Sequence, residues 1–329
     1  MAIFDIIAKV ANIPKGANMS VVFSIKNKKK LLGYASVLSV EEALQLAPNL
    51  AQFSFDEDEK GFNAQAFYSS KIPYEGCIVI GVKGLSGRGF ELNYNEGEKS
   101  YEVRVLTPSA RADWQIALEF MSNLAARLGS SIIADTDERS YDAQGILKFD
   151  YECDIMFGLQ ATKNDFEKNK TDTYINYGIT RPFVMNLAMI EEILADGDPV
   201  DKYSQMLVAT QHLDAYAAHQ QFFENDTGEI LGLYVLSQGL DTLLPFEPYI
   251  EYENLEILGD RKVAKWQLSL VAVDGDDQSE ESYKPFAGVP YKKFMANLPQ
   301  DKYRFIDATY IKINGLSKQE LEQIAAKCE

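Results

Sequence analysis

The fold of this chain is constrained most by three runs of alternating apolar and polar residues that lead into one long amphipathic segment. The first run, CIVIGVKG, begins at Cys77, and RGFELNYNEGEKSYEVRVLT follows it with a Gly-containing turn between two further runs. Alternation broken by glycine turns predicts an antiparallel meander. Residues 107–129 then carry Trp114 and Leu118 at helical spacing and stop at Gly129, which predicts a helix.

The remaining segments extend this mixture of strands and helices. The run SVVFSI predicts a strand, and Ser39 with Glu42 forms a capping box for a short helix. A helical region is predicted over residues 183–223, with a break at Asp196–Pro199. We then expect strands at ILGLYVLS, around PYIEYENLEIL, at KWQLSLVAV and at YRFIDATYIKI, and a terminal helix over 317–326.

These elements predict an α+β fold with two domains, each of mostly antiparallel strands packed with helices. The polar stretch TKNDFEKNKTDT, residues 162–173, is interpreted as the boundary. The domains are therefore predicted at 19–165 and 172–329. Residues 1–18 form an extension with an amphipathic helical pattern.

Charge and composition narrow the class of protein. The 329 residues are 46% hydrophobic and carry a net charge of −17, of which −13 falls on residues 171–329. A negative field of this size argues against nucleic acid and anionic membranes as partners, and favours a basic protein. Asp5 interrupts the N-terminal apolar stretch and no basic segment precedes it, so we expect a cytoplasmic protein without a signal peptide.

Two further features have ordinary structural interpretations. Cys77, Cys153 and Cys328 are odd in number and lie outside any metal-binding spacing, so neither a disulfide framework nor a zinc site is implied. The basic run NKKKLLG, which contains Lys28–Lys30, is interpreted as a solvated hairpin turn. The sequence completes no cofactor motif, and we expect no cofactor.

A glycine-rich loop, GLSGRGFEL, is a candidate anion-binding site. Backbone N–H groups at Gly87, the hydroxyl of Ser86 and the guanidinium of Arg88 are groups that bind anions. Phosphate loops of the nucleotide-binding folds lead into a helix, however, whereas a strand follows here. A tight hairpin turn is the alternative interpretation.

An acidic cluster, LSLVAVDGDDQSEES, is a candidate metal site. Asp274 and Asp276 follow an apolar strand, as the carboxylate ligands of several Mg²⁺ sites do. The Walker partner motif is absent, and calcium-loop spacing would require an acid where Pro285 stands. A solvated acidic loop is the alternative interpretation.

The only two histidines, His212 and His219, are predicted to lie on one helix, seven residues apart. At about 1.5 Å per residue they are too far apart to share a metal. We expect them near solvent, at a contact surface, and a general-base role remains an alternative.

Several segments together resemble a family. MSVVFSIKNKKK, YEGCIVIGVKGLSGRGFEL, TPSARADWQIALEF, LLPFEPYIEYEN and KWQLSLVAVDGDD are similar to an uncharacterised family of bacterial cytoplasmic proteins, found mainly in Firmicutes and described only as a domain of unknown function. The resemblance covers the chain from Met19 onward and implies no activity and no catalytic residues.

Three functional hypotheses follow. The first is a non-catalytic protein-binding module of immunity, inhibitor or adaptor type that uses the acidic C-terminal half. The second is a metal-dependent enzyme that acts on a phosphate- or sugar-containing small molecule through Asp274 and Asp276. The third is a homo-oligomeric structural protein in which the helix of residues 1–18 provides the contact face. Because no complete catalytic motif is present, the sequence favours the first.

Overall fold

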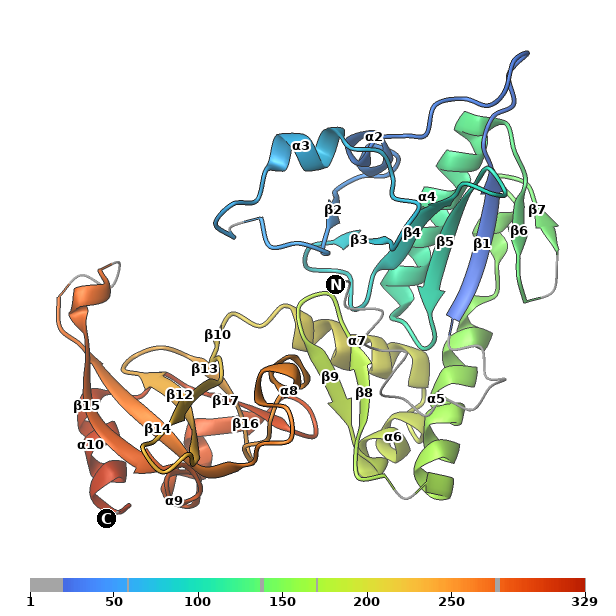
Figure 1. Cartoon of the computed structure of the whole chain (residues 1–329). Helices are drawn as coiled ribbons and strands as arrows, with labels where there is room; N and C mark the ends of the chain where they lie inside the picture. Colours follow the sequence, from blue (N-terminus) through green and yellow to red (C-terminus); the bar gives the residue numbers. More distant parts are fainter. Residues whose placement is uncertain (1–19, 58, 137–138, 170, 276–278, 329) are drawn as a thin grey trace. The chain divides into compact units, whose positions relative to one another are not determined.

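The computed structural model describes residues 20–57, 59–136, 139–169, 171–275 and 279–328. The chain divides into two compact units, Met1–His212 (unit 1) and Leu213–Glu329 (unit 2). Both combine helices with mainly antiparallel strands, which confirms the α+β prediction (Figure 1). The predicted helix of residues 1–18 lies outside the described residues.

A seven-stranded sheet of order β2-β3-β4-β5-β1-β6-β7 dominates unit 1, and every neighbouring pair in it is antiparallel. The predicted meander is confirmed as β3, β4 and β5, in which Leu92 lies opposite both Ile78 and Val103. The strands are β1 (Ser20–Lys26), β2 (Leu50–Gln52), β3 (Ile78–Val82), β4 (Phe90–Asn95), β5 (Ser100–Leu106), β6 (Ile132–Ala134) and β7 (Ser140–Tyr141).

Helix α4 (Arg111–Leu128) packs its apolar stripe against this sheet, as predicted. Trp114 and Phe120 are fully buried, and the Phe120 ring lies 4.9 Å from that of Phe90 on β4. Gly129 ends the helix with a φ of 64°, a conformation that costs little only for glycine.

The rest of unit 1 is a set of helices and one β-hairpin. Helix α5 contacts α4, α6 and α7, and buries Ile155, Leu159, Thr162 and Phe166 along one face. The boundary predicted at 162–173 does not separate the two units. Residues 162–169 continue α5 and its apolar stripe, and the division lies after His212. The elements are α5 (Tyr151–Asn169), β8 (Tyr174–Tyr177), β9 (Pro182–Met185), α6 (Leu187–Leu194) and α7 (Pro199–Gln211).

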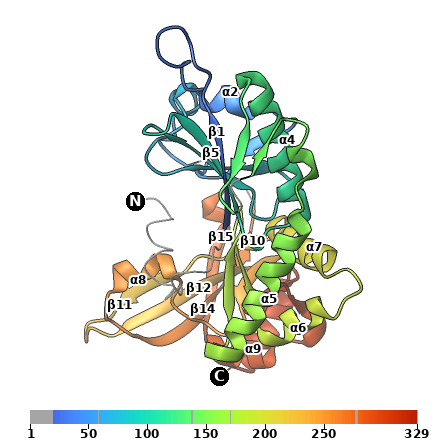
Figure 2. The same cartoon turned by 90° about the vertical axis from the view of Figure 1, so that its right-hand side faces the viewer.

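Two short helices and a projecting loop complete unit 1. Helix α2 (Val40–Leu44) has the predicted capping box between Ser39 and Glu42, and it contacts α3 (Ala64–Ser69). Residues 27–35, which we call the basic hairpin, follow β1 and form the predicted turn, with a bridge between Lys29 and Tyr34. This hairpin, in blue, extends beyond the end of β1 in both views (Figures 1 and 2).

Unit 2 contains two four-stranded sheets, of order β11-β12-β14-β15 and β10-β13-β17-β16. Three of the four predicted strand segments are confirmed, as β12, β14 and the pair β16–β17. The strands are β10 (Tyr216–Ala217), β11 (Gln221–Glu224), β12 (Ile230–Ser237), β13 (Thr242–Pro245), β14 (Val263–Val273), β15 (Tyr283–Pro290), β16 (Tyr303–Phe305) and β17 (Tyr310–Ile313).

The helices of unit 2 are α8 (Tyr252–Leu258), α9 (Tyr291–Asn297) and α10 (Lys318–Ala326). The predicted terminal helix is confirmed as α10, with Ser317 as its N-cap. The strand predicted around PYIEYENLEIL is wrong, because this segment forms α8. Leu255 and Leu258 are spaced for a helix, and Gly259 ends it with a positive φ.

Candidate functional site

The glycine-rich loop binds an anion that belongs to the chain itself. The carboxylate of Asp113, near the start of α4, accepts hydrogen bonds from the backbone N–H groups of Gly87, Arg88 and Gly89 at 2.9–3.0 Å. It also accepts one from the N–H of Ala110 at 3.1 Å. The chemistry expected of a glycine-rich anion nest is therefore present, and a buried internal carboxylate satisfies its donors.

The other two candidate groups of this loop also form hydrogen bonds within the protein, Ser86 fully buried and Arg88 half-buried. The Ser86 hydroxyl accepts the Val82 N–H at 3.0 Å. Arg88 donates from Nε to the carbonyl of Tyr177 and from Nη1 to that of Pro108. Burial raises the pKa of Asp113 and lowers that of Arg88, and the loop N–H groups act against the shift at Asp113. The loop joins the sheet, α4 and the β8–β9 hairpin.

The two histidines do not share a helix, so that prediction is wrong. His212 is the C-cap of α7, and its Nε2 lies 2.8 Å from the carbonyl oxygen of Ser86, which fits donation of an N–H. His219 follows β10 in unit 2 and is exposed, with its ring in edge contact with Tyr216. At the last residue of α7, the Gln211 side chain accepts the N–H groups of Thr180 and Arg181, an interaction that local helix propensity does not predict.

The candidate metal ligand Asp274 is exposed and forms a 3.0 Å ion pair with Lys284. This partner holds the pKa of Asp274 below its usual range. Asp276 lies outside the described residues. Within the described ranges, no three His, Cys, Asp or Glu side chains lie close enough together to hold a metal ion.

Asp154 on α5 is an ionisable group that the sequence did not single out. Burial raises its pKa to about 6, although the Thr107 hydroxyl donates to the carboxylate at 2.9 Å. A carboxyl with such a pKa can exchange protons near neutral pH. Within the described residues, the Thr107 hydroxyl is the hydrogen-bond partner of this carboxylate.

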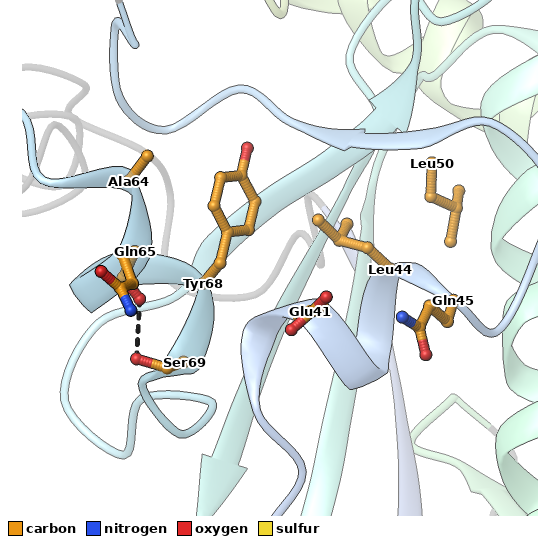
Figure 3. A pocket seen from close by; sticks show the side chains of 8 residues that line it. All are labelled: Glu41, Leu44, Gln45, Leu50, Ala64, Gln65, Tyr68 and Ser69. Atoms are coloured by element: carbon orange, nitrogen blue, oxygen red, sulfur yellow. Dashed lines mark hydrogen bonds between the residues drawn. The ribbon is translucent and has the colours of Figure 1, made fainter.

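An open groove of about 690 Å³ lies between α2 and α3 (Figure 3). Leu44 and Tyr68 face one another across it in the figure. The Tyr68 hydroxyl donates to the Glu57 carboxylate, and burial together with this bond raises the pKa of Tyr68 to about 12. The groove can therefore accept an apolar group, but its phenol is already engaged. Its lining residues are Glu41, Leu44, Gln45, Leu50, Ala64, Gln65, Tyr68 and Ser69.

The acidity of the C-terminal half is concentrated in one segment of unit 2. Residues 213–260 contain ten Asp and Glu and no Lys or Arg, whereas residues 261–329 contain ten acids and eleven bases. Large apolar side chains are also exposed in the acidic segment, including Phe223, Tyr249 and Leu255. Acidic and aromatic side chains thus belong to the same stretch of chain.

The Gln220 side chain brings two parts of this segment together. Its Oε1 accepts the N–H of Glu251 at 3.0 Å and the Asn254 amide at 3.1 Å, and its Nε2 donates to the Tyr249 carbonyl and the Tyr234 hydroxyl. Gln220 immediately precedes β11, so these bonds place α8 beside that strand. A 3.1 Å ion pair joins Glu224 on β11 to Arg261, which lies three residues after the end of α8.

The exposed side chains of these elements include both carboxylates and apolar groups, and together we call them the acidic surface. The Tyr310 hydroxyl on β17 donates to the carboxylate of Glu251, the N-cap of α8, at 2.7 Å. Burial raises the pKa of Tyr310, so this phenol stays protonated as a donor. The exposed members of the acidic surface are Phe223, Glu224, Asp226, Glu229, Glu247, Tyr249, Leu255, Glu256 and Asp260.

A comparison with protein families matches residues 20–324 to the model described as domain of unknown function DUF4299. The chain belongs to this family. No functionally curated protein and no solved structure matches it. The match spans both units, so the acidic surface and the glycine-rich loop both lie inside the family domain.

In this DUF4299 chain, the sequence indicated that the C-terminal half is acidic, but not which of its carboxylates and aromatic side chains are exposed. Asp113 carried one signal, because an acid at the third position of a helix commonly bonds back to the N-cap N–H. Gln220 carried none, since its partners lie about thirty residues away. Over the described residues, no helix is both long and apolar enough to cross a membrane.

Proposed function

We propose that this protein is a non-catalytic, cytoplasmic protein-binding module, of immunity, inhibitor or adaptor type, that binds a basic partner on the acidic surface of unit 2. One observation carries the proposal: α8 and β11, clamped together by Gln220, present carboxylates without a lysine or arginine in their segment, together with exposed Phe223, Tyr249 and Leu255.

Each part of this surface has a role in association. The carboxylates of this surface attract a basic partner and raise the rate of encounter, an effect that salt weakens. Aromatic side chains contribute most of the binding energy when they enter a pocket on the partner. The Gln220 bonds hold α8 in place before binding, which reduces the ordering cost of association.

The metal-dependent alternative has less support. Asp274 is neutralised by Lys284, and both side chains are exposed to solvent. A metal site at this position would have to displace that lysine. The homo-oligomer hypothesis depends on residues 1–18, which lie outside the described residues.

The experiment is site-specific photo-crosslinking in the cells that naturally make the protein. A photoreactive phenylalanine analogue replaces Phe223, and a comparison protein carries it at Phe305 on β16, because both positions are 51% exposed. We expect position 223 to capture a protein of basic isoelectric point, with a yield that falls as salt is added to the lysate, and position 305 not to capture it.

A charge-reversal variant tests the acidic component separately. Changing Glu247, Glu256 and Asp260 to lysine should reduce the yield from position 223 about 10-fold, in line with the contribution of steering charges. Reversal of three acids elsewhere in unit 2, Glu281, Asp301 and Glu322, gives the same net charge and should change the yield little. A neutral or acidic captured protein, equal effects of the two variants, or equal capture at both positions would refute the proposal.

Gln220→Ala should also weaken capture, because α8 loses its bonds to the residue that precedes β11. Hydrogen exchange should become faster in residues 252–258. Gln221→Ala, which changes an exposed neighbour of the same type, is the control. Unchanged exchange in Gln220→Ala would show that the clamp does not order this surface.

A further inference from the structure

The basic hairpin of unit 1 presents two leucines directly to solvent. Leu31 is 101% exposed and Leu32 is 91% exposed, the two highest values among the large apolar side chains that the structure describes. Tyr34, on the same hairpin, is 42% exposed. Apolar side chains in this position gain stability only when another phase or molecule covers them.

Hydrogen bonds at its base give the hairpin a defined shape. Asn27 is 3% exposed, and its side chain donates to the Ala35 carbonyl at 2.9 Å and the Tyr94 hydroxyl at 3.3 Å. The Ala35 N–H donates to the Lys28 carbonyl at 2.8 Å, and the Lys30 N–H donates to the Gly33 carbonyl at 2.9 Å. The leucines are therefore held at the tip by a folded base.

Three lysines directly precede the two leucines in the sequence. Lys28, Lys29 and Lys30 are exposed, and none forms an ion pair with a described carboxylate. Residues 20–40 contain no Asp or Glu. The carboxylates of the neighbouring β4–β5 turn are already paired, Glu98 with Lys26 and Glu96 with Lys99.

We propose that the basic hairpin docks on an anionic lipid surface, with Leu31 and Leu32 in the acyl region and Lys28–Lys30 beside the phosphates. Lysines and apolar side chains act together in such reversible anchoring. Tyrosine is enriched at the depth between these two regions, which fits Tyr34 at the side of the tip.

A bilayer fits this hairpin better than a protein partner does. Residues 28–34 are too few to bury the roughly 800 Å² per partner of a stable protein interface. A fluid lipid phase closes around a protruding tip from every side, and both leucines are open on every side.

The net charge of −17 on the whole chain opposes this docking at long range. Salt limits that repulsion, because charges farther than about 8 Å from the surface are screened at physiological ionic strength. The three lysines at the tip act at contact, where each contributes about fivefold to partitioning, and about 100-fold together.

The test is sedimentation of the full-length chain with vesicles of phosphatidylcholine and phosphatidylserine, and with vesicles of phosphatidylcholine alone. We expect binding to the anionic vesicles that high salt weakens. Leu31→Ser with Leu32→Ser should reduce it by about 10-fold per leucine removed. Changing Lys28–Lys30 to glutamine should reduce it about 100-fold.

The matched control is Lys83→Gln with Leu85→Ser, an exposed lysine and leucine on the β3–β4 turn, which should bind as the wild type does. Tyr34→Trp should give a blue-shifted emission on binding. Absence of wild-type binding, equal binding by the hairpin variants, or a loss in the control would overturn the proposal. Hairpin-dependent self-association without vesicles would also overturn it and assign the tip to a second copy.

Discussion

Replacing Asp113 by asparagine removes the anion from the glycine-rich loop and keeps the shape of the side chain. In the native structure, Oδ1 accepts the N–H groups of Gly87 and Gly89, and Oδ2 accepts those of Arg88 and Ala110. Asparagine retains one acceptor oxygen and replaces the other with an NH₂ group, which is itself a donor. Two buried backbone N–H groups therefore lose their acceptor.

The cost follows from the number of N–H groups affected. A buried donor without a partner costs about 1–3 kcal/mol, so two of them lower the free energy of unfolding by about 4 kcal/mol. For a unit the size of Met1–His212, each kcal/mol changes Tm by about 2–4 °C, which predicts a decrease of about 8–16 °C.

Urea denaturation followed by tryptophan fluorescence measures this change in unit 1. The chain has two tryptophans, Trp114 in unit 1 and Trp266 in unit 2, so a Trp266→Phe background makes the signal specific. Glu119→Gln, the same kind of change at an exposed site on α4, should stay within about 0.5 kcal/mol of the parent. If Asp113→Asn also stays within 1 kcal/mol, the carboxylate does not hold the loop.

Three further predictions concern the same structure. Gly89→Ala should destabilise unit 1 by more than about 3 kcal/mol, because φ is +63° and the new Cβ would lie 2.4 Å from the Ile80 carbonyl oxygen. Gly84→Ala, where φ is also positive but the space around the Cβ is open, should cost about 1 kcal/mol in the same urea assay. Burial raises the folded-state pKa of Asp154 from 3.8 to about 6, so the native state loses stability as the pH rises through this range. Urea titrations should therefore find Asp154→Asn more stable than the wild type by about 1–2 kcal/mol at neutral pH, and equal to it below pH 3.8. Thermal unfolding should give the same Tm with and without Mg²⁺ for the wild type and for Asp274→Asn, and a Mg²⁺-dependent increase lost in the variant would favour the enzyme hypothesis instead.

The elements that the sequence predicted correctly are those whose pattern is local and repeated. The meander β3–β5 consists of three apolar-rich runs separated by glycine-containing turns, and α4 carries an apolar residue on every turn until Gly129. Helix α5 was not predicted, and its last turns were interpreted as a domain boundary because they have one buried residue each, Thr162 and Phe166, among lysines and acids. The alternation in the α8 segment satisfied the strand pattern as well as the helical one.

The candidate sites depended on contacts that no local pattern encodes. The loop glycines indicated an anion nest, but its anion lies 26 residues further along the chain from Gly87. The last residue of α7, Gln211, bonds through its side chain to residues about thirty positions earlier. Acidity was visible in the sequence, whereas its concentration beside exposed aromatic side chains required the fold.

The anion that the glycine-rich loop binds, the Asp113 carboxylate, is always present. Because Asp113 is tethered to the same chain, its local concentration is fixed by the fold and does not follow the level of any metabolite. A free phosphate or nucleotide would have to displace the Asp113 carboxylate, which cannot diffuse away from the loop. We therefore expect the loop not to bind such ligands, and its N–H groups instead connect the sheet to helix α4 at all times.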